Sequence, residues 1–246
     1  MIEQKISIII PTYNEKESLL SLLYRIEETT QKHNIQTEII VVDDNSPDGT
    51  GEIANSLAKT NKNITVIHRP KKLGLGSAYK TAFKKATGET VITMDADLSH
   101  DPEEFPHLLE VLGNHKVDVV IGSRYVKGAK IIGWSLRRRL ISKIGNLLAR
   151  RVLGLEIRDL TSGYRVYRHD VMGRILGEIN SDGFFFQVEA LYDTIREGFK
   201  VREHRIFFTE RKKGRSNLNL AECLTFFLAL FRLKTVTLVE GRIFEN

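Results

Sequence analysis

Apolar and polar positions alternate in blocks along the first half of the chain. Short runs rich in β-branched residues predict strands at 5–10, 38–42, 64–68, 90–94 and 118–121. Between them, apolar residues recur three and four positions apart and predict helices at 17–33, 50–59 and 77–86. A further helix begins at Asp101, which suits an N-cap, with Pro102 at the first helical position. This alternation predicts an α/β fold with a mostly parallel central sheet and helices on both faces.

The pattern from residue 124 onward is less regular. It predicts, in chain order, a loop at 127–130, a basic amphipathic helix at 134–153, a polar loop at 158–165 that enters a short strand, a helix beginning within 184–189, a strand at 201–209 and a strongly apolar helix at 219–231. The sequence contains no internal repeat, low-complexity tract or linker. We therefore expect the 246 residues to form one domain.

Composition places the chain among ordinary globular proteins, with 41% hydrophobic and 28% charged residues. Its one cysteine, Cys223, cannot form a disulfide within the chain, which suits a reducing, cytoplasmic setting. The N-terminus shows no signal-peptide pattern, and the apolar run 226–231 is far shorter than the roughly 20 residues that span a bilayer. We expect a cytoplasmic chain that does not cross a membrane by itself.

The net charge of +6 comes with basic clusters in the second half of the chain. These clusters lie at 137–139, 150–151 and 211–215. Such clusters suit phosphate groups, anionic lipid heads or nucleic acid, and a solvated face is the alternative for any one of them.

Acidic and polar residues directly follow three of the predicted strands. They are Tyr13-Asn14-Glu15, Asp43-Asp44 and Asp95-Ala96-Asp97. Asp95 and Asp97 point to the same side in extended backbone, so by themselves they fit either a site for a hard cation or a solvated turn before the next helix. The carboxyl ends of parallel strands meet at one edge of the sheet, where ligands of doubly wound sheets bind. Three such clusters at one edge favour a nucleotide–metal site over three independent turns.

Seven motifs lie along the chain between Pro11 and Ser216, and the resemblance that they carry extends from about Ser7 to Phe231. They are Pro11-Thr12-Tyr13-Asn14-Glu15, Val42-Asp43-Asp44-Asn45-Ser46-Pro47-Asp48-Gly49-Thr50, Leu73-Gly74-Leu75-Gly76, Met94-Asp95-Ala96-Asp97-Leu98-Ser99-His100, Gly122-Ser123-Arg124-Tyr125, Asp159-Leu160-Thr161-Ser162-Gly163-Tyr164-Arg165 and Arg211-x-x-Gly214-x-Ser216. Together they resemble the motifs of the dolichol-phosphate (polyprenyl-phosphate) mannosyltransferases, which are inverting glycosyltransferases of the family-2 type.

This resemblance implies a Rossmann-like, nucleotide-binding glycosyltransferase A fold. It also implies transfer of mannose from GDP-mannose to the phosphate of dolichol or another polyprenol, with inversion at the sugar. The implied donor-binding residues are Pro11, Tyr13, Glu15, Val42, Asp44, Asp95, Ala96, Asp97, Arg124, Arg211 and Asn217. Asp97 would ligate Mg²⁺ or Mn²⁺, and Asp95 would be a second metal ligand that also shapes the nucleotide pocket.

The same resemblance implies catalytic roles for Asp97, Arg124 and Arg138, in which Arg138 receives the lipid phosphate. Residues 1–125 would then form the nucleotide-sugar-binding half, residues 126–217 the acceptor-binding half, and residues 218–246 a C-terminal apolar helix and tail. His100 needs no chemical role, since an acceptor phosphate is already anionic at neutral pH. We expect this histidine to pack at the helix start or to make a loop hydrogen bond.

Two positions depart from the family pattern. Asn217 stands where the motif continues to a lysine at the donor phosphates, so that Lys213 or Arg215 would supply the cation or the phosphate contact would be weaker. Arg205 stands in the late strand where the family often has a proline, which bears on the local backbone more than on the chemistry.

A polyprenyl tail stays in the bilayer, so the resemblance implies an enzyme at a membrane surface. We expect it to be peripheral on the cytoplasmic face, of the endoplasmic reticulum in a eukaryote or of the plasma membrane in a prokaryote. The basic clusters and the apolar helix at 220–231 could provide the docking. The alternatives are that this helix closes the core or that a separate membrane-anchoring subunit is the partner.

Two other functions fit parts of the sequence. An enzyme with the same fold and lipid acceptor could use UDP-glucose or another nucleotide sugar, since one or two hydrogen bonds decide base and sugar. A non-catalytic nucleotide- or nucleic-acid-binding module would use the +6 charge. That module leaves the three acidic strand ends unexplained, so we expect no nucleic-acid partner.

Overall fold

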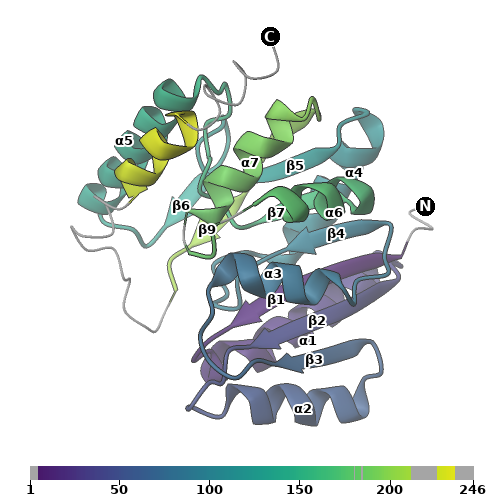
Figure 1. Cartoon of the computed structure of the whole chain (residues 1–246). Helices are drawn as coiled ribbons and strands as arrows, with labels where there is room; N and C mark the ends of the chain where they lie inside the picture. The colour runs from purple at the N-terminus through teal and green to yellow at the C-terminus, as the bar shows by residue number, and fades with distance from the viewer. Residues whose placement is uncertain (1–4, 180, 184, 212–225, 236–246) are drawn as a thin grey trace.

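A seven-stranded sheet forms the centre of the molecule in the computed structural model (Figure 1). The structure describes residues 5–179, 181–183, 185–211 and 226–235. Its strands are β1 (Ile6–Thr12), β2 (Thr37–Asp43), β3 (Ile64–His68), β4 (Thr90–Thr93), β5 (Val119–Ser123), β7 (Arg165–Arg168) and β8 (Val201–Arg205). The strand order is β3-β2-β1-β4-β7-β5-β8. Every neighbouring pair is parallel except the two pairs made by β7, which runs antiparallel to β4 and β5. The predicted mostly parallel sheet is confirmed.

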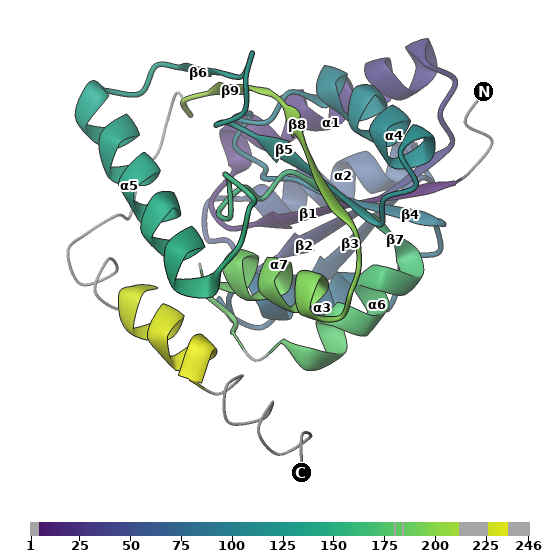
Figure 2. The ribbon, with the colours of Figure 1, turned by 90° about the horizontal axis from the view of Figure 1, so that it is seen from above.

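Helices cover both faces of this sheet (Figure 2). The helices α1 (Lys16–Lys32), α2 (Thr50–Thr60) and α4 (Phe105–Asn114) contribute to one hydrophobic core. The helices α3 (Leu75–Phe83), α6 (His169–Glu178) and α7 (Phe186–Arg196) contribute to a second core on the other face. A 3₁₀ turn at Pro102–Glu104 precedes α4, and the Asp101 side chain caps it by accepting from the Glu103 backbone N–H.

The apolar run of β1 shows why a continuous hydrophobic strand forms here. Ile8 and Ile10 pack in the core beneath α1, whereas Ile9 lies in the core on the opposite face. All three side chains are fully buried. Because successive residues of a strand point to opposite faces, a strand covered on both sides needs apolar residues at every position.

Three features of the second half differ from the prediction. Helix α6 was not predicted, although its apolar residues recur at helical spacing. The predicted strand 201–209 is two strands, because Ile206 bonds to β5 while β9 (Phe207–Thr209) turns away to pair with β6 (Lys130–Ile132). The predicted loop 127–130 therefore ends one residue early, since Lys130 already belongs to β6.

Helix α5 (Leu136–Leu153) and a helix over 226–235 lie side by side at one end of the molecule (Figure 1, Figure 2). Leu230 of the second helix is fully buried and packs in a cluster with Ala149 and Leu153. Of the apolar helix predicted at 219–231, residues 219–225 lie outside the described residues. Within the part of the chain that the structure describes, no helix has the length and hydropathy to cross a membrane.

Candidate active site

Three acidic strand ends meet at one edge of the sheet. Strand β1 is parallel to β2 and to β4, and Thr12 pairs with Asp43 in register at the ends of β1 and β2. The polar segments at or directly after the ends of these strands are 13–15, 43–44 and 95–97, so the convergence predicted from the sequence is confirmed.

Asp97 and Asp95 differ in their surroundings. The Asp97 carboxylate is buried: Oδ1 accepts from the Ser99 backbone N–H at 3.0 Å, and Oδ2 lies 3.0 Å from Nη2 of Arg211. The Asp95 side chain is 43% exposed at the edge of the sheet. A Cβ at Gly163 would lie 3.2 Å from Asp95 Oδ1, a tight contact that the Asp95 carboxylate would have to relieve by a small shift, so the loop of Gly163 passes close to this acid.

His100 has the packing and hydrogen-bonding role expected of it. Its Nδ1 accepts from the Asp95 backbone N–H at 3.1 Å, which leaves the proton on Nε2, 3.8 Å from Asp95 Oδ2. The ring stacks on Tyr164 at 4.9 Å between centroids and meets the Phe208 ring edge-on. Burial lowers the pKa of His100 despite the neighbouring carboxylates, so the imidazole is neutral at pH 7.

Glu15 and Tyr13 follow β1 at the same edge. Partial burial raises the pKa of the Glu15 carboxyl, and the charges of Asp97 and Asp95 raise it further, while the hydrogen bond from Ser18 acts in the opposite sense. The Tyr13 ring is 39% exposed, with Lys72 Nζ 4.6 Å from its centroid. An exposed ring beside a cation could accommodate a nucleobase and a phosphate.

Asp44 is held by an arginine that the sequence analysis missed. Arg69 Nε donates to Asp44 Oδ1 at 2.5 Å, and its Nη1 and Nη2 donate to Ser77 Oγ and the Gly74 carbonyl. The Leu73 backbone N–H donates to Asp44 Oδ2. This buried pair therefore fixes the glycine-rich segment before α3. The signal was present, since Arg69 directly follows β3 at the edge where the acids follow their strands.

The other residues predicted to bind the donor are buried, half-buried or outside the described residues. The side chains of Val42 and Ala96 are buried in the hydrophobic cores, so only their backbone could face a nucleotide. The Val42 carbonyl accepts from Thr12 Oγ1. Pro11 is half-buried within β1. Asn217 and the alternative cations Lys213 and Arg215 lie outside the described residues, so their roles stay predictions.

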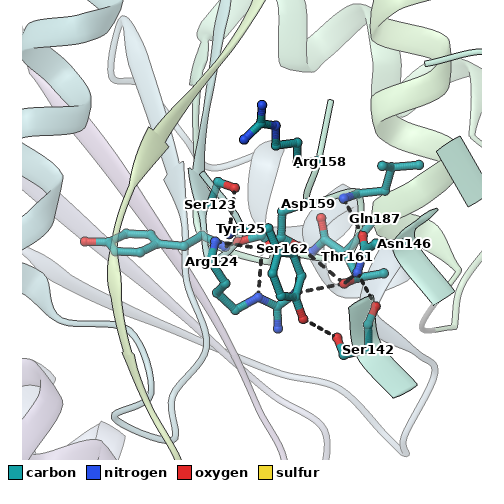
Figure 3. A network of polar contacts seen from close by, with 12 residues as sticks. Ser123, Arg124, Tyr125, Ser142, Asn146, Arg158, Asp159, Thr161, Ser162 and Gln187 are labelled. Carbon is teal, nitrogen blue, oxygen red and sulfur yellow. Dashed lines mark hydrogen bonds and ion pairs between the residues drawn. The ribbon is translucent and has the colours of Figure 1, made fainter. Parts of the chain in front are cut away.

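Arg124 is bound inside the protein rather than lying open at the edge (Figure 3). Its Nε and Nη2 donate to the two carboxylate oxygens of Asp159 at 2.8 and 2.7 Å, and Nη2 also donates to Thr161 Oγ1. Asp159 is fully buried. Burial alone would raise its pKa, but Arg124 lowers it below the ordinary value, so the carboxyl stays ionised.

Aromatic rings and a second acid complete this network. The Arg124 guanidinium lies 5.3–5.6 Å from the ring centroids of Tyr125, Trp134 and Phe208. The Glu203 carboxylate accepts from the backbone N–H groups of Arg158 and Asp159. Two of the three nitrogens of the Arg124 guanidinium, Nε and Nη2, are thus already bound to Asp159. The predicted contact of Arg124 with a donor phosphate has to be made by this engaged guanidinium.

Glu210 and Arg211 are adjacent in the chain, and each forms an ion pair: Glu210 with Arg138, and Arg211 with Asp97. Arg138 Nη1 lies 2.5 Å from Oε1 of Glu210, and its guanidinium is 4.4 Å from the Trp134 ring centroid. The next residue, Arg211, pairs with Asp97. A line of opposite charges therefore runs from the start of α5, past the end of β9, to the acids after β4.

The acids at this edge fit a hard divalent cation in part. Among the described residues, no group of three or more His, Cys, Asp or Glu side chains gathers as a ready-made metal cage. Asp95 and Asp97 offer carboxylate oxygens, the ligand type that Mg²⁺ and Mn²⁺ prefer. Because Mg²⁺ is commonly bound by one or two carboxylates together with substrate phosphates, this donor set suits a cation that arrives with a diphosphate.

Comparison with known proteins agrees with this arrangement. Residues 7–176 match the model of glycosyl transferase family 2. An undecaprenyl-phosphate mannosyltransferase of Micrococcus luteus is 42% identical over 215 residues, covering 86% of this chain and 86% of that protein. A polyprenol monophosphomannose synthase of Mycolicibacterium smegmatis is 41% identical over 221 residues, covering 88% of this chain and 82% of that protein.

Solved structures share the fold. A mannosyltransferase from Pyrobaculum calidifontis in complex with GDP-Man and Mn²⁺ superposes with a TM-score of 0.60 at 20% identity, over 87% of this chain and 58% of that chain. A glucosyl-3-phosphoglycerate synthase from Mycobacterium tuberculosis with Mn²⁺, UDP-glucose and phosphoglyceric acid gives 0.70 at 18% identity, over 95% and 80%. The chain thus has a glycosyltransferase A fold and belongs to glycosyl transferase family 2, as a glycosyltransferase related to the undecaprenyl-phosphate and polyprenol mannosyltransferases.

Proposed function

We propose that this enzyme transfers mannose from GDP-mannose to the phosphate of a polyprenol, with inversion, giving a β-mannosyl polyprenyl phosphate. The observation that carries the proposal is the ion pair between Asp97 and the guanidinium of Arg211, next to Asp95 at the carboxyl edge of the sheet. Support comes from relatives of more than 40% identity named as mannosyltransferases of undecaprenyl phosphate and polyprenol. The fold-level neighbour with GDP-Man and Mn²⁺ is consistent with the choice of donor.

The donor half of the reaction follows from the charges at the edge. Breaking the bond between mannose and diphosphate leaves negative charge on GDP, which bound Mg²⁺ or Mn²⁺ would neutralise. Asp97, with Asp95 beside it, would hold that cation. Arg211, and Arg124 through the part of its guanidinium that Asp159 does not engage, would stabilise the leaving diphosphate. Tyr13, Glu15 and the pocket around Asp44 would orient the nucleoside.

The acceptor half needs orientation more than proton transfer. A phosphate monoester is largely dianionic at pH 7, so its oxygen can attack the anomeric carbon without a general base. Attack opposite to the leaving diphosphate inverts the anomeric centre. His100 is buried, neutral and bonded within its loop, which agrees with a mechanism that does not use it as a base. Arg138, at the first turn of α5, would bind the acceptor phosphate.

The acceptor side also carries an apolar surface suited to a bilayer. Six large apolar residues of α5 are between 39% and 84% exposed: Leu136, Leu140, Ile141, Ile144, Leu147 and Leu148. Leu228 and Phe231 of the neighbouring helix are exposed as well. Exposed apolar side chains with flanking arginines are typical of helices that lie in a membrane interface. We infer peripheral binding to the cytoplasmic face of a membrane, with α5 contributing beside the C-terminal helix.

A transfer assay tests the donor, acceptor and metal together. Radiolabelled GDP-mannose and UDP-glucose would each be incubated with dolichyl and undecaprenyl phosphate, with and without EDTA, and the product anomer identified by NMR. We expect β-mannosyl lipid from GDP-mannose and its loss with EDTA. Preference for UDP-glucose would overturn the choice of donor, and an α-linked product would overturn the inversion. Transfer that continues unchanged in EDTA would overturn the metal role of Asp97.

Membrane binding is tested separately by cosedimentation with vesicles containing anionic lipid. We expect the protein to pellet with the vesicles. Ile144→Asp, which places a charge in the exposed face of α5, should weaken this binding while transfer to a short, soluble polyprenyl phosphate continues. Equal vesicle binding by the variant would place the membrane contact elsewhere.

A further inference from the structure

The carboxylate proposed to bind the divalent cation already has a cation beside it. Asp97 Oδ2 lies 3.0 Å from the guanidinium of Arg211, and Oδ1 is occupied by the Ser99 backbone N–H. The Asp97 side chain is 6% exposed and that of Arg211 is 38% exposed. A metal ion and this guanidinium would therefore compete for the same buried oxygen.

The main chain around Arg211 is anchored, so its side chain can change partner without moving the backbone. The Thr209 N–H donates to the Ser99 carbonyl at 3.1 Å, and the Glu210 N–H donates to the Ile132 carbonyl at 2.8 Å. The Glu210 side chain is held in turn by Arg138. The long side chain of Arg211 thus begins at a fixed point next to the loop of Asp97, and rotation about its own bonds can carry the guanidinium to a nearby ligand.

We propose that Arg211 is an internal counter-ion of Asp97, which the diphosphate of the donor draws away so that nucleotide and divalent cation bind together. This inference rests on the proposed function, because it takes the ligand to be a nucleoside diphosphate. Arginine binds phosphate oxygens through two parallel N–H donors. A diphosphate is therefore a better partner for the guanidinium than a single buried carboxylate oxygen. Transfer of the guanidinium to the diphosphate frees Oδ2 for the metal, while the phosphates complete the shell that two carboxylates begin.

The proposal makes the two ligands energetically coupled. Without nucleotide, a metal ion has to displace a tethered guanidinium from Asp97, so its affinity is low. With nucleotide, that competitor is removed and the phosphates add ligands, so its affinity rises. By linkage, the metal must increase the affinity for the nucleotide by the same factor. In this role Arg211 is a positioning residue that sets how donor and metal assemble, in addition to contacting the phosphates.

The test measures Mn²⁺ binding to the full chain by electron paramagnetic resonance, with and without GDP, and in parallel with UDP. For the wild type we expect weak Mn²⁺ binding alone and binding tightened on the order of tenfold or more by nucleotide. Arg211→Gln should bind Mn²⁺ alone about five- to tenfold more tightly, and the additional effect of nucleotide should shrink by at least that factor. The readout requires no catalytic turnover.

Matched variants separate the counter-ion from general charge effects. Arg174→Gln removes the same charge from an arginine on α6 that lies 2.6 Å from the Glu197 carboxylate. This variant should leave Mn²⁺ binding unchanged. Asp97→Asn should bind Mn²⁺ weakly under both conditions. Circular dichroism of each variant establishes that it is folded.

The results of this series distinguish failure of the counter-ion role from failure of the proposed function. If Arg211→Gln has wild-type affinity for Mn²⁺ alone, or keeps the full nucleotide effect, the counter-ion role is overturned and the proposed function stands. If the wild-type protein fails to bind Mn²⁺ in the presence of GDP and also in the presence of UDP, the proposed function itself is overturned. If Asp97→Asn binds Mn²⁺ as the wild type does, the metal lies elsewhere and both statements fail.

Discussion

Two arginines near the acidic edge are held in opposite ways. Arg124 forms a two-pronged ion pair with the fully buried Asp159 and is surrounded by three aromatic rings. Arg211 makes one contact with Asp97 from a side chain that is 38% exposed. Removing one partner of a buried pair leaves an uncompensated charge in a poorly solvated place, whereas an exposed arginine can exchange its partner for water or a ligand.

This contrast separates architecture from ligand binding. The Arg124–Asp159 pair joins the end of β5 to the loop before β7, because Asp159 also accepts from the Arg124 backbone N–H. The Arg211–Asp97 and Arg138–Glu210 pairs instead lie on the side where donor and acceptor phosphates are proposed to bind. We therefore expect changes at the first pair to affect stability most, and changes at the others to affect binding and transfer.

The largest effect is expected from Asp159→Asn. The substitution leaves the buried Arg124 guanidinium without its counter-charge, which should lower the free energy of unfolding by about 3–5 kcal/mol. Urea unfolding at pH 7.5, followed by circular dichroism, measures this change. Arg211→Ala is the comparison variant and should lose less stability, because the Asp97 carboxylate that it leaves behind keeps its hydrogen bond from the Ser99 backbone N–H. Equal losses in the two variants would show that burial does not distinguish the pairs.

Asp97→Asn should affect transfer and leave stability nearly unchanged. Losing the negative charge that holds the cation should reduce kcat on the order of a hundredfold or more, since charge stabilisation in the transition state has effects of this size. The assay is mannose transfer under saturating GDP-mannose, Mg²⁺ and polyprenyl phosphate. An Asp97→Asn enzyme with wild-type kcat would mean that the acids after β4 do not hold the metal.

Asp193 on α7 is a buried acid like Asp159, but its negative charge is less well compensated by nearby positive charge. Burial raises its pKa to about 6; Arg196, 3.7 Å away, acts against the shift, and nearby glutamates add to it. An acid with a raised pKa destabilises the fold when it ionises, so this cost is absent below about pH 4 and complete above about pH 6. For Asp159, whose pKa is lowered, the stabilising effect is instead lost as the pH falls.

Asp193→Asn should therefore be more stable than the wild type at pH 7.5, by at most about 3 kcal/mol, and equal to it near pH 4. Urea unfolding at both pH values measures the difference. A difference of the same size at both pH values would indicate altered packing rather than removal of a charge.

The smallest effect is expected from the pair Arg138–Glu210. Arg138→Ala should raise the KM for polyprenyl phosphate about tenfold with a smaller change for GDP-mannose, since it removes a proposed contact to the acceptor phosphate. Glu210→Gln is the control for loss of the ion pair itself and should change the free energy of unfolding by less than about 1 kcal/mol. Equal KM changes for both substrates in Arg138→Ala would assign this arginine to the donor.

Much of the nucleotide half could be predicted because its signals are local. The β-branched runs, the cap at Asp101 and the acids after β1, β2 and β4 all lie within a few residues of the features they define. The second half was harder. Strand β7 lies inside the sheet, antiparallel to both neighbours, and after Ile206 the chain turns away from this sheet to form β9, which pairs with β6. No periodic pattern in the sequence indicates either arrangement.

The sequence by itself determined the alternating fold, the sheet edge where the polar strand ends meet, and a family resemblance specific enough to name the chemistry. Only the tertiary structure decided which charges meet across that edge: Arg69 with Asp44, Arg124 with Asp159, and Arg211 with Asp97. The physical reason is that hydrophobic periodicity reports on a residue's own helix or strand. An ion pair depends instead on strand order and side-chain reach between segments far apart in the chain.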